Sequence, residues 1–297
     1  MRINHRSDII ILVITFFFWG SVYAASKFVY PFIPPLTVVM FRSSLSAVLF
    51  GLLLLKQGGF KREKRHLPEK KHIWVFVLTG FMMYASAVSL TNVATRFLGA
   101  SMSALLNCLN PIFISFFAML MLKEKLNARI ISGIIISLIG VIVVLGVSFK
   151  GVSLPGVAFS LTAVLLWSIA SVIIRKLSGI YTPVEISFYV SLCAIPFNIF
   201  YSFLELRTAS VKFTPLAIAV MLYIVVCGGF IPSYLWNRSL SRNPASICSM
   251  FYPVQPMAAT LLGVIILGEK LTWNFFAGAA VIFAGVLLGL SSGKRTG

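Results

Sequence analysis

The chain alternates between long apolar stretches and short polar connections, and this pattern predicts membrane-spanning helices. A hydrocarbon core of about 30 Å requires roughly 20 consecutive apolar residues in a helix. Ten stretches meet this requirement, at 8–28, 33–55, 73–93, 98–121, 128–148, 154–175, 183–204, 214–235, 245–267 and 272–291. Strands of a membrane β-barrel would instead alternate apolar and polar residues over about ten positions. The sequence therefore predicts an all-α integral membrane protein with ten transmembrane helices.

The first apolar stretch also has features of a secretory signal peptide. Arg2 and Arg6 precede it, and the small residues Ala24 and Ala25 lie at its end. The apolar region of a signal peptide has only about 7–15 residues, however, and the run from Ile9 is longer. We therefore expect this stretch to be the first transmembrane helix.

The composition agrees with a membrane protein, because 59% of the residues are hydrophobic, 11% are charged and the mean hydropathy is +0.98. About a quarter of the residues of an ordinary soluble domain are charged. The net charge of +18 would suggest a nucleic-acid partner in a soluble chain. Here the basic residues lie almost entirely in the connections, so we expect the lipid bilayer as the surroundings and no nucleic-acid partner.

The basic residues also predict the orientation. With the N-terminus in the cytoplasm, 18 of the 25 Lys and Arg residues lie inside, six lie outside, and Arg42 is left within the second span. Short cytoplasmic connections carry an excess of Lys and Arg in membrane proteins. We therefore expect a multi-pass protein of the cytoplasmic membrane with both termini in the cytoplasm.

The two halves of the sequence are similar to each other. At an offset of 148 residues Trp19 aligns with Trp167 and Pro35 with Pro183; at 145 residues, Asn92 aligns with Asn237, Pro111 with Pro256, and Glu-Lys-Leu at 124–126 with the same residues at 269–271. Five spans per half is an odd number, so the second half would enter the membrane in the opposite direction. Residues 1–150 and 151–297 are thus predicted to be inverted five-helix repeats, an architecture of secondary transporters.

Several of these motifs resemble those of the ten-helix EamA exporters of the drug/metabolite transporter superfamily. The matching residues are Trp19-Gly20-Ser21, Pro35 followed by Arg42, Asn110-Pro111, Lys-Glu-Lys-Leu at 123–126 and Gly-Glu-Lys-Leu at 268–271. The resemblance implies a central cavity surrounded by the first four helices of each half, with helices five and ten at the periphery. It also implies transport, although members of the family differ widely in substrate, and we expect the export of a small metabolite such as an amino acid. A polytopic membrane enzyme or a lipid-handling protein without transport activity is the alternative.

Arg42 is the most distinctive candidate for a binding residue. A charge near the middle of a transmembrane helix costs roughly 2.5–3.5 kcal/mol on insertion scales, so we expect its side chain to face the interior of the bundle. Its guanidinium group could bind a substrate carboxylate or phosphate through two parallel hydrogen bonds, or act in gating. A structural ion pair is the alternative.

Aromatic and amide side chains near the middle of the spans are further candidates for the substrate site. The aromatic candidates offer flat walls with polar edges, suited to amphipathic or aromatic compounds, whereas packing is their commoner role. The amides require polar partners at this depth, which interhelical hydrogen bonds could equally supply. The candidates are Trp19, Tyr23, Trp167, Tyr189, Tyr252, Asn107, Asn110 and Gln255. Asn92 and Asn237, which match across the repeat, could cap helices or gate the pathway.

Two prolines and one carboxylate could serve the transport cycle. Pro111 and Pro256 each remove a backbone hydrogen bond, so we expect kinks that act as hinges in the fourth and ninth spans. Glu185 is the only acidic residue predicted within a span, and it could carry a coupled proton. The alternative is that its carboxylate complements the N-terminus of the seventh span.

The remaining motifs concern packing and chemistry that we do not expect. Helices five and ten contain small residues, including Gly-x-x-x-Gly at 285–289, which could form a homodimer or pack within one chain. The four cysteines lie in spans without paired spacing, so neither disulfides nor a metal site is expected. The chain has no Gly-x-x-x-x-Gly-Lys-Ser/Thr motif, and no cofactor or enzymatic activity is expected.

Overall fold

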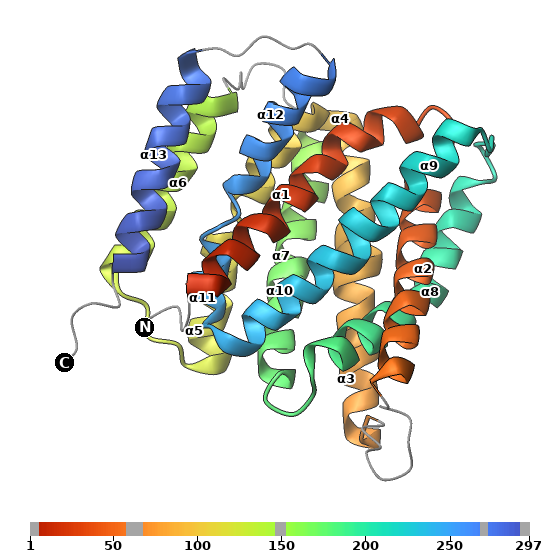
Figure 1. Ribbon diagram of the computed structural model, residues 1–297, viewed down its shortest axis with the longest axis horizontal. Helices are drawn as coiled ribbons and strands as arrows, with labels where there is room; N and C mark the ends of the chain where they lie inside the picture. The colour runs from red at the N-terminus through yellow and green to blue at the C-terminus, as the bar shows by residue number, and fades with distance from the viewer. Residues whose placement is uncertain (1–5, 58–67, 146–152, 268–272, 292–297) are drawn as a thin grey trace.

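A computed structural model describes residues 6–57, 68–145, 153–267 and 273–291, and this part of the chain forms a helix bundle (Figure 1). The elements, in chain order, are α1 (Arg6–Val29), α2 (Pro35–Lys56), α3 (Lys70–Gly80), η2 (Phe81–Ala87), α4 (Val88–Asn107), α5 (Asn110–Leu122), α6 (Ala128–Leu145), α7 (Leu154–Leu177), α8 (Pro183–Glu205), α9 (Pro215–Tyr223), η3 (Ile224–Phe230), α10 (Ile231–Arg242), α11 (Ala245–Ser249), α12 (Val254–Leu267) and α13 (Trp273–Leu290). In Figure 1, α1 begins at the lower end of the bundle, and α2 begins at its upper end.

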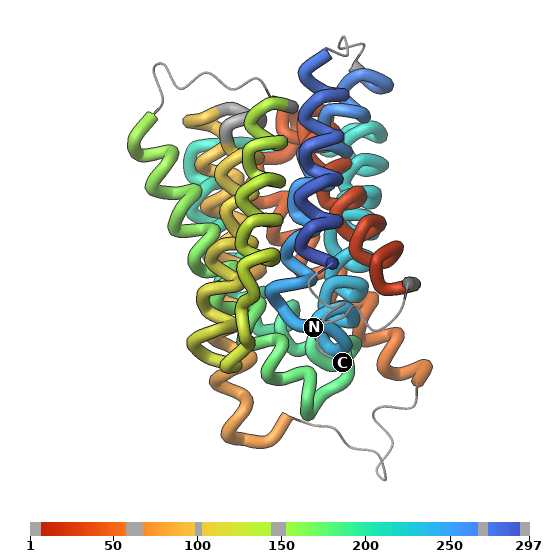
Figure 2. The backbone as a smooth tube through the Cα atoms, turned by 90° about the vertical axis from the view of Figure 1, so that its left-hand side faces the viewer, coloured from red at the N-terminus to blue at the C-terminus, as the bar shows by residue number. Residues whose placement is uncertain are grey.

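The predicted all-α membrane fold is confirmed. Within the described ranges, nine helical segments are long and apolar enough to cross a membrane, and a tenth, Ala128–Val143, is apolar but shorter. Their surfaces carry exposed large apolar side chains, such as Trp74, Leu154 and Trp273, as expected for helices in contact with lipid. Tubes seen from the side show the long helices running between the two ends of the bundle (Figure 2), and Figure 1 shows α1 and α10 inclined to α2 and α7.

The third span of each half contains a π-helical segment. η2 and η3 occupy nearly equivalent places in the two halves, within α3–α4 and within α9–α10. Such segments are rare, and they leave backbone carbonyls without regular helical partners. The carbonyl of Tyr84 in η2 accepts a hydrogen bond of 3.3 Å from Asn198 Nδ2 of α8. Thus a buried amide of the second half stabilises the irregular backbone of the first.

The connection predicted near residues 94–97 lies within α4, whose helical backbone continues to Asn107. The hydroxyl of Thr95 nevertheless donates to the hydroxyl of Ser103 over 2.9 Å. Residues eight positions apart in a straight helix are separated by about 12 Å along its axis. The chain must therefore bend sharply between them, so the prediction of a turn is right although the helical hydrogen bonding is not interrupted.

The fourth and ninth spans are broken rather than kinked. α4 ends at Asn107 and α5 begins at Asn110, while α11 ends at Ser249 and α12 begins at Val254. Pro111 and Pro256 therefore lie in first turns, where a helical N–H has no intrahelical partner and the missing donor costs little. The carbonyl that Pro111 leaves free, that of Asn107, accepts from Asn110 Nδ2 at 2.8 Å. The interruptions precede the prolines, and their role as hinges stays a prediction.

α6 and α13, the fifth and tenth spans, lie side by side at one edge of the bundle (Figures 1 and 2). Their small residues face each other within the chain, because a Cβ atom on Gly133 would lie 2.5 Å from the carbonyl oxygen of Gly285, and one on Gly140 would lie 2.8 Å from that of Gly278. The Gly-x-x-x-Gly pattern is therefore used in intramolecular packing. A homodimer through these helices would need their outer faces and stays a prediction.

Two buried carboxylates connect the halves, one at each end of the bundle. At the lower end, Glu124 accepts hydrogen bonds from the backbone N–H groups of Ala245 and Ser246 (2.9 and 3.3 Å) and from the Ser246 hydroxyl (2.7 Å). At the upper end, Glu205 accepts from the N–H and the hydroxyl of Thr37 (2.9 and 3.3 Å). We call these contacts the lower clasp and the upper clasp.

Candidate functional site

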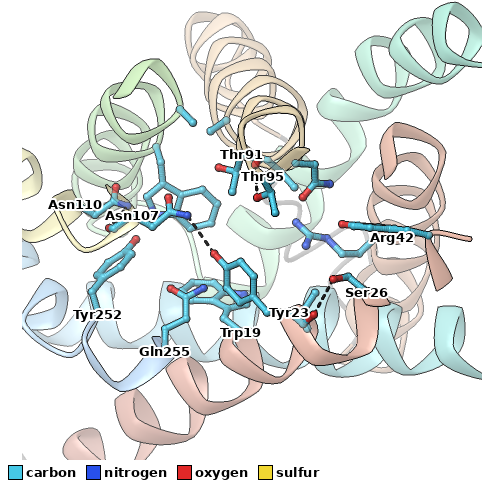
Figure 3. A pocket seen from close by; sticks show the side chains of 17 residues that line it. Trp19, Tyr23, Ser26, Arg42, Thr91, Thr95, Asn107, Asn110, Tyr252 and Gln255 are labelled. Carbon is cyan, nitrogen blue, oxygen red and sulfur yellow. Dashed lines mark hydrogen bonds between the residues drawn. The ribbon is translucent and has the colours of Figure 1, made fainter. Parts of the chain in front are cut away.

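A cavity of about 120 Å³ lies between the two halves (Figure 3). Its wall includes Ser26 and Tyr30 near the upper end of α1, which places the cavity in the upper part of the bundle. The first half supplies most of its wall, and the second half completes it with α7, α12 and the turn before α12. The lining residues are Trp19, Val22, Tyr23, Ser26, Tyr30, Arg42, Ala87, Val88, Thr91, Asn92, Thr95, Asn107, Asn110, Ala163, Trp167, Tyr252 and Gln255. Most of the residues predicted for the substrate site are thus brought together by the fold.

Arg42 extends from α2 toward the centre of the cavity (Figure 3). Its side chain is half-buried, and no residue that the structure describes forms a hydrogen bond or an ion pair with it. Of the described residues that line the cavity, it is the only charged one. A guanidinium group can bind a carboxylate or phosphate through two parallel hydrogen bonds, and the role of Arg42 in binding a substrate stays a prediction.

The position of Arg42 depends on a glycine in the π-helical segment η3. A Cβ atom on Gly229 would overlap the hydroxyl oxygen of Ser46 and would lie 2.9 Å from Cγ of Arg42. The Ser46 hydroxyl in turn donates to the carbonyl of Val225 over 3.4 Å. The stem of Arg42 therefore packs directly against the backbone of η3, which connects the guanidinium of the first half to an irregular helix of the second.

The other side of the cavity combines amides and aromatic rings. Asn107 Nδ2 donates to the hydroxyl of Tyr23 (3.1 Å), and Ser168 Oγ donates to Oδ1 of Asn110 (3.1 Å). No described residue hydrogen-bonds to the side-chain amide of Gln255, which lines the cavity together with Tyr252. The Asn107 and Gln255 oxygens and the Gln255 amide group can therefore accept from, or donate to, a neutral polar group of a ligand.

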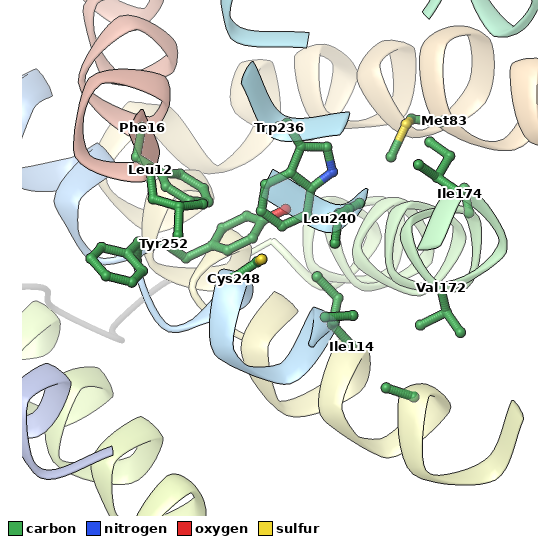
Figure 4. Packing of buried hydrophobic residues seen from close by; sticks show 14 of the residues in the cluster. Leu12, Phe16, Met83, Ile114, Val172, Ile174, Trp236, Leu240, Cys248 and Tyr252 are labelled. Carbon is green, nitrogen blue, oxygen red and sulfur yellow. The ribbon is translucent and has the colours of Figure 1, made fainter. Parts of the chain in front are cut away.

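Aromatic rings close the cavity toward the lower end. Trp19 contacts Trp167 edge to face, with centroids 5.4 Å apart, and Trp236 at 5.9 Å. The ring centroids of Phe16 and Tyr252 are 4.6 Å apart, and Trp236, which contacts both rings, is fully buried (Figure 4). The lower clasp lies below this layer. A ligand in the cavity would therefore have to pass a packed aromatic layer to reach the lower end.

Comparisons with known proteins identify the family. The model of the EamA-like transporter family matches residues 6–146 and again residues 154–291. The chain belongs to the EamA-like transporter family. Uncharacterized transporters of Clostridium kluyveri and Archaeoglobus fulgidus are 27% and 24% identical, over 88% and 94% of this chain and 85% and 97% of their own lengths. A solved crystal structure has the same fold, with a TM-score of 0.81 at 18% identity over 98% of this chain and 99% of that one.

Of the residues predicted for substrate binding and proton coupling in this EamA-like transporter, Tyr189 and Glu185 lie outside the cavity. Tyr189 of α8 packs against Phe76 and Phe188, at centroid distances of 5.2 Å in both cases. Glu185 forms a capping box, in which its Oε2 accepts from the N–H and hydroxyl of Thr182 (2.7 and 2.8 Å) and its own N–H donates to that hydroxyl. The structure thus shows the helix-capping alternative for Glu185, because its carboxylate is occupied locally.

Several cavity residues of the transporter were absent from the predicted set. Successive spacings of four, three and four residues separate Trp19, Tyr23, Ser26 and Tyr30. The first three side chains therefore lie on one face of α1, and Tyr30 continues this face in the turn after the helix. Thr91 and Thr95 form a comparable face on α4 together with Asn92, for which the sequence predicts a capping or gating role. This helical periodicity could have extended the predicted site. Asn237, the repeat partner of Asn92, is buried elsewhere and donates to Ser187 Oγ over 2.8 Å.

Proposed function

We propose that the protein is a secondary transporter that exports a small metabolite bearing a carboxylate, an amino acid or a related compound, by alternating access. The observation that carries the proposal is the position of Arg42, which extends without a described partner into a cavity between the two halves. A cavity at the interface of two repeats is where secondary transporters bind their substrates. Membership of the family supports a role in transport, and the Arg42 guanidinium supports a substrate that bears a carboxylate.

The distribution of charge and packing supports the direction of access. The described basic residues at the lower end, which include Lys70, Lys71, Lys123, Lys125, Arg129, Arg175, Lys176, Arg238 and Arg242, outnumber those at the upper end, Lys27, Arg96, Arg207 and Lys212. By the positive-inside rule the lower end would face the cytoplasm, with the protein in the cytoplasmic membrane. The cavity would then lie toward the outside, in the conformation from which an exporter releases its substrate.

The proposal is tested by an export screen followed by flux measurements. Cells that overexpress the protein are screened for export of an amino-acid and metabolite panel, and the purified protein is reconstituted in liposomes for each compound found. Arg42→Gln should reduce flux of a carboxylate by about 10- to 100-fold, because two charge-assisted hydrogen bonds of about 1.5–3 kcal/mol each weaken. Arg207→Gln is the matched control, since Arg207 lies at the upper end outside the cavity.

Unchanged flux in the Arg42→Gln protein, at equal amounts in the membrane, would remove the binding role of Arg42. If the purified protein carried none of the compounds but chemically altered a lipid, the transporter proposal would fail in favour of a membrane enzyme.

A further inference from the structure

Each described carboxylate of the protein has a partner away from the cavity. Besides the two clasps and the capping box of Glu185, Asp8 accepts from Asn243 Nδ2 (3.3 Å) and lies 3.6 Å from Nη1 of Arg242. Glu69 forms an ion pair with Lys71 at 2.7 Å. The cavity wall itself contains no Asp, Glu, Lys or His among the described residues that line it, so Arg42 gives it a single fixed positive charge.

This arrangement discriminates among ligands by net charge. An anion supplies the acceptors that the Arg42 guanidinium lacks, and both charges are then compensated. A zwitterion of the same shape brings an additional ammonium group, for which the wall offers only neutral oxygens such as those of Asn107 and Gln255 and the aromatic faces. A cation meets the repulsion of Arg42 with no compensating carboxylate. The rings of Trp19 and Trp167 favour a flat apolar body.

The same observation bears on what drives transport. A carrier that binds a proton together with its substrate needs a group in the pathway that gains and loses the proton, and intramembrane carboxylates or histidines serve in this way. The described cavity wall provides none of these groups. A proton carried together with the substrate would therefore have no described carboxylate or histidine in the cavity wall to bind.

We infer that the substrate is a monoanion with a flat apolar body, and that the membrane potential, negative inside, drives its export. This inference rests on the proposed function and narrows it to a charge class and an energy source. Moving one elementary charge through 100 mV is worth about 2.3 kcal/mol, which corresponds to a distribution ratio of about 50-fold. No pH gradient would be required.

The test uses three probes that share one ring system and differ in net charge. N-acetyl-tryptophan is an anion, tryptophan a zwitterion and tryptophanamide a cation at neutral pH. Each radiolabelled probe is given to liposomes with the full-length protein, and valinomycin with a K⁺ gradient sets the potential. We expect the anion to be carried fastest and to be distributed about 50-fold per 100 mV toward the positive side. Arg42→Gln should abolish this order, and Arg207→Gln should leave it intact.

Three results would overturn the inference while leaving transport itself standing. The first is a flux of the anion that does not depend on the membrane potential. The second is accumulation of the anion driven by a pH gradient at zero membrane potential. The third is faster transport of tryptophan or tryptophanamide than of the anion. Failure of all three probes, with another compound of the screen carried, would also overturn it. The proposed function would fail separately, and only if no compound of the screen were transported by the reconstituted protein.

Discussion

The lower and upper clasps are built alike but join different parts of the transporter. In each, a buried carboxylate of one half accepts hydrogen bonds from the first turn of a helix in the other half. The side chain of Glu205 is 7% exposed, and Glu124 as a residue is 9% exposed. Glu124 accepts hydrogen bonds from two backbone N–H groups, whereas Glu205 accepts one from a backbone N–H group. Glu205 Oε1 also lies 3.5 Å from Nη2 of the exposed Arg96.

The difference between the clasps lies in what they connect to the cavity. The lower clasp joins the connection after α5 to α11, and these belong to the two broken spans that carry Asn110 and Tyr252 in the cavity wall. The upper clasp joins α2, which carries Arg42, to α8, which has no residue in the cavity wall. We therefore expect the lower clasp to control which side of the membrane the cavity faces, and the upper clasp to support only the position of α2.

The largest effect is expected for Glu124→Gln. An amide keeps the shape but lacks the charge and one acceptor, so the closed lower end should lose about 1.5–3 kcal/mol, a population shift of roughly 10- to 100-fold. The measurement is the rate at which an impermeant maleimide labels Thr91→Cys from outside, in a protein whose four cysteines are replaced. Labelling should slow, by at most this factor. An unchanged rate would mean that the lower clasp does not hold the outward-facing state.

A smaller effect, about tenfold on the KM for an anion, is expected for Gly229→Ala. The added methyl group would displace the Arg42 stem and Ser46 from η3. Adding Ser46→Ala removes the closest overlap, so a double variant that stays impaired would assign the loss to Arg42. Gly179→Ala is the control, because the nearest atom to its Cβ lies 3.6 Å away. A KM that changes equally in both glycine variants would contradict the packing argument.

For Tyr23→Phe we expect an increase of about fivefold in KM, because Asn107 Nδ2 loses its partner at a cost of about 1 kcal/mol. Tyr189→Phe is the matched control, since it removes the same hydroxyl outside the cavity, and its flux should stay within about twofold of the parent protein. Equal losses in the two variants would show that the cavity wall does not define the site.

The smallest effect on the cavity is expected for Glu205→Gln, with less than about threefold change in the labelling of Thr91→Cys. Its effect should instead appear in stability, as a lower melting temperature, because the amide weakens the hydrogen bonds from Thr37. A labelling change as large as that of Glu124→Gln would remove the distinction between the two clasps.

The helices and much of the site could be predicted from the sequence because each depends on local information. Long apolar runs determine the spans, and Arg42 must face the interior since lipid cannot accommodate its charge. Aligned prolines located the interruptions to within a few residues. Tyr189 was predicted to line the cavity, but its ring packs against Phe76 and Phe188. The sequence does not distinguish these two positions, because a ring in a cavity wall and a ring in the core can lie at the same depth in the membrane.

Other features depend on contacts between distant residues and had no signal in the sequence. Glu124 could be recognised as part of a repeated motif, but its partners at 245–246 lie far away in the chain. The π-helical segments had no signal of this kind either. The close contact of the Arg42 side chain with Gly229 depends on the packing of α2 against η3. These contacts join residues of the two halves that lie far apart in the sequence.

The most direct test of the central claim, that Arg42 binds an anion in the cavity between the halves, is ligand protection of the Thr91→Cys label. N-acetyl-tryptophan at saturating concentration should slow labelling at least fivefold in the protein with Arg42 and should have no effect after Arg42→Gln. Equal labelling rates with and without the anion in the Arg42 protein, or equal protection in both proteins, would contradict the account.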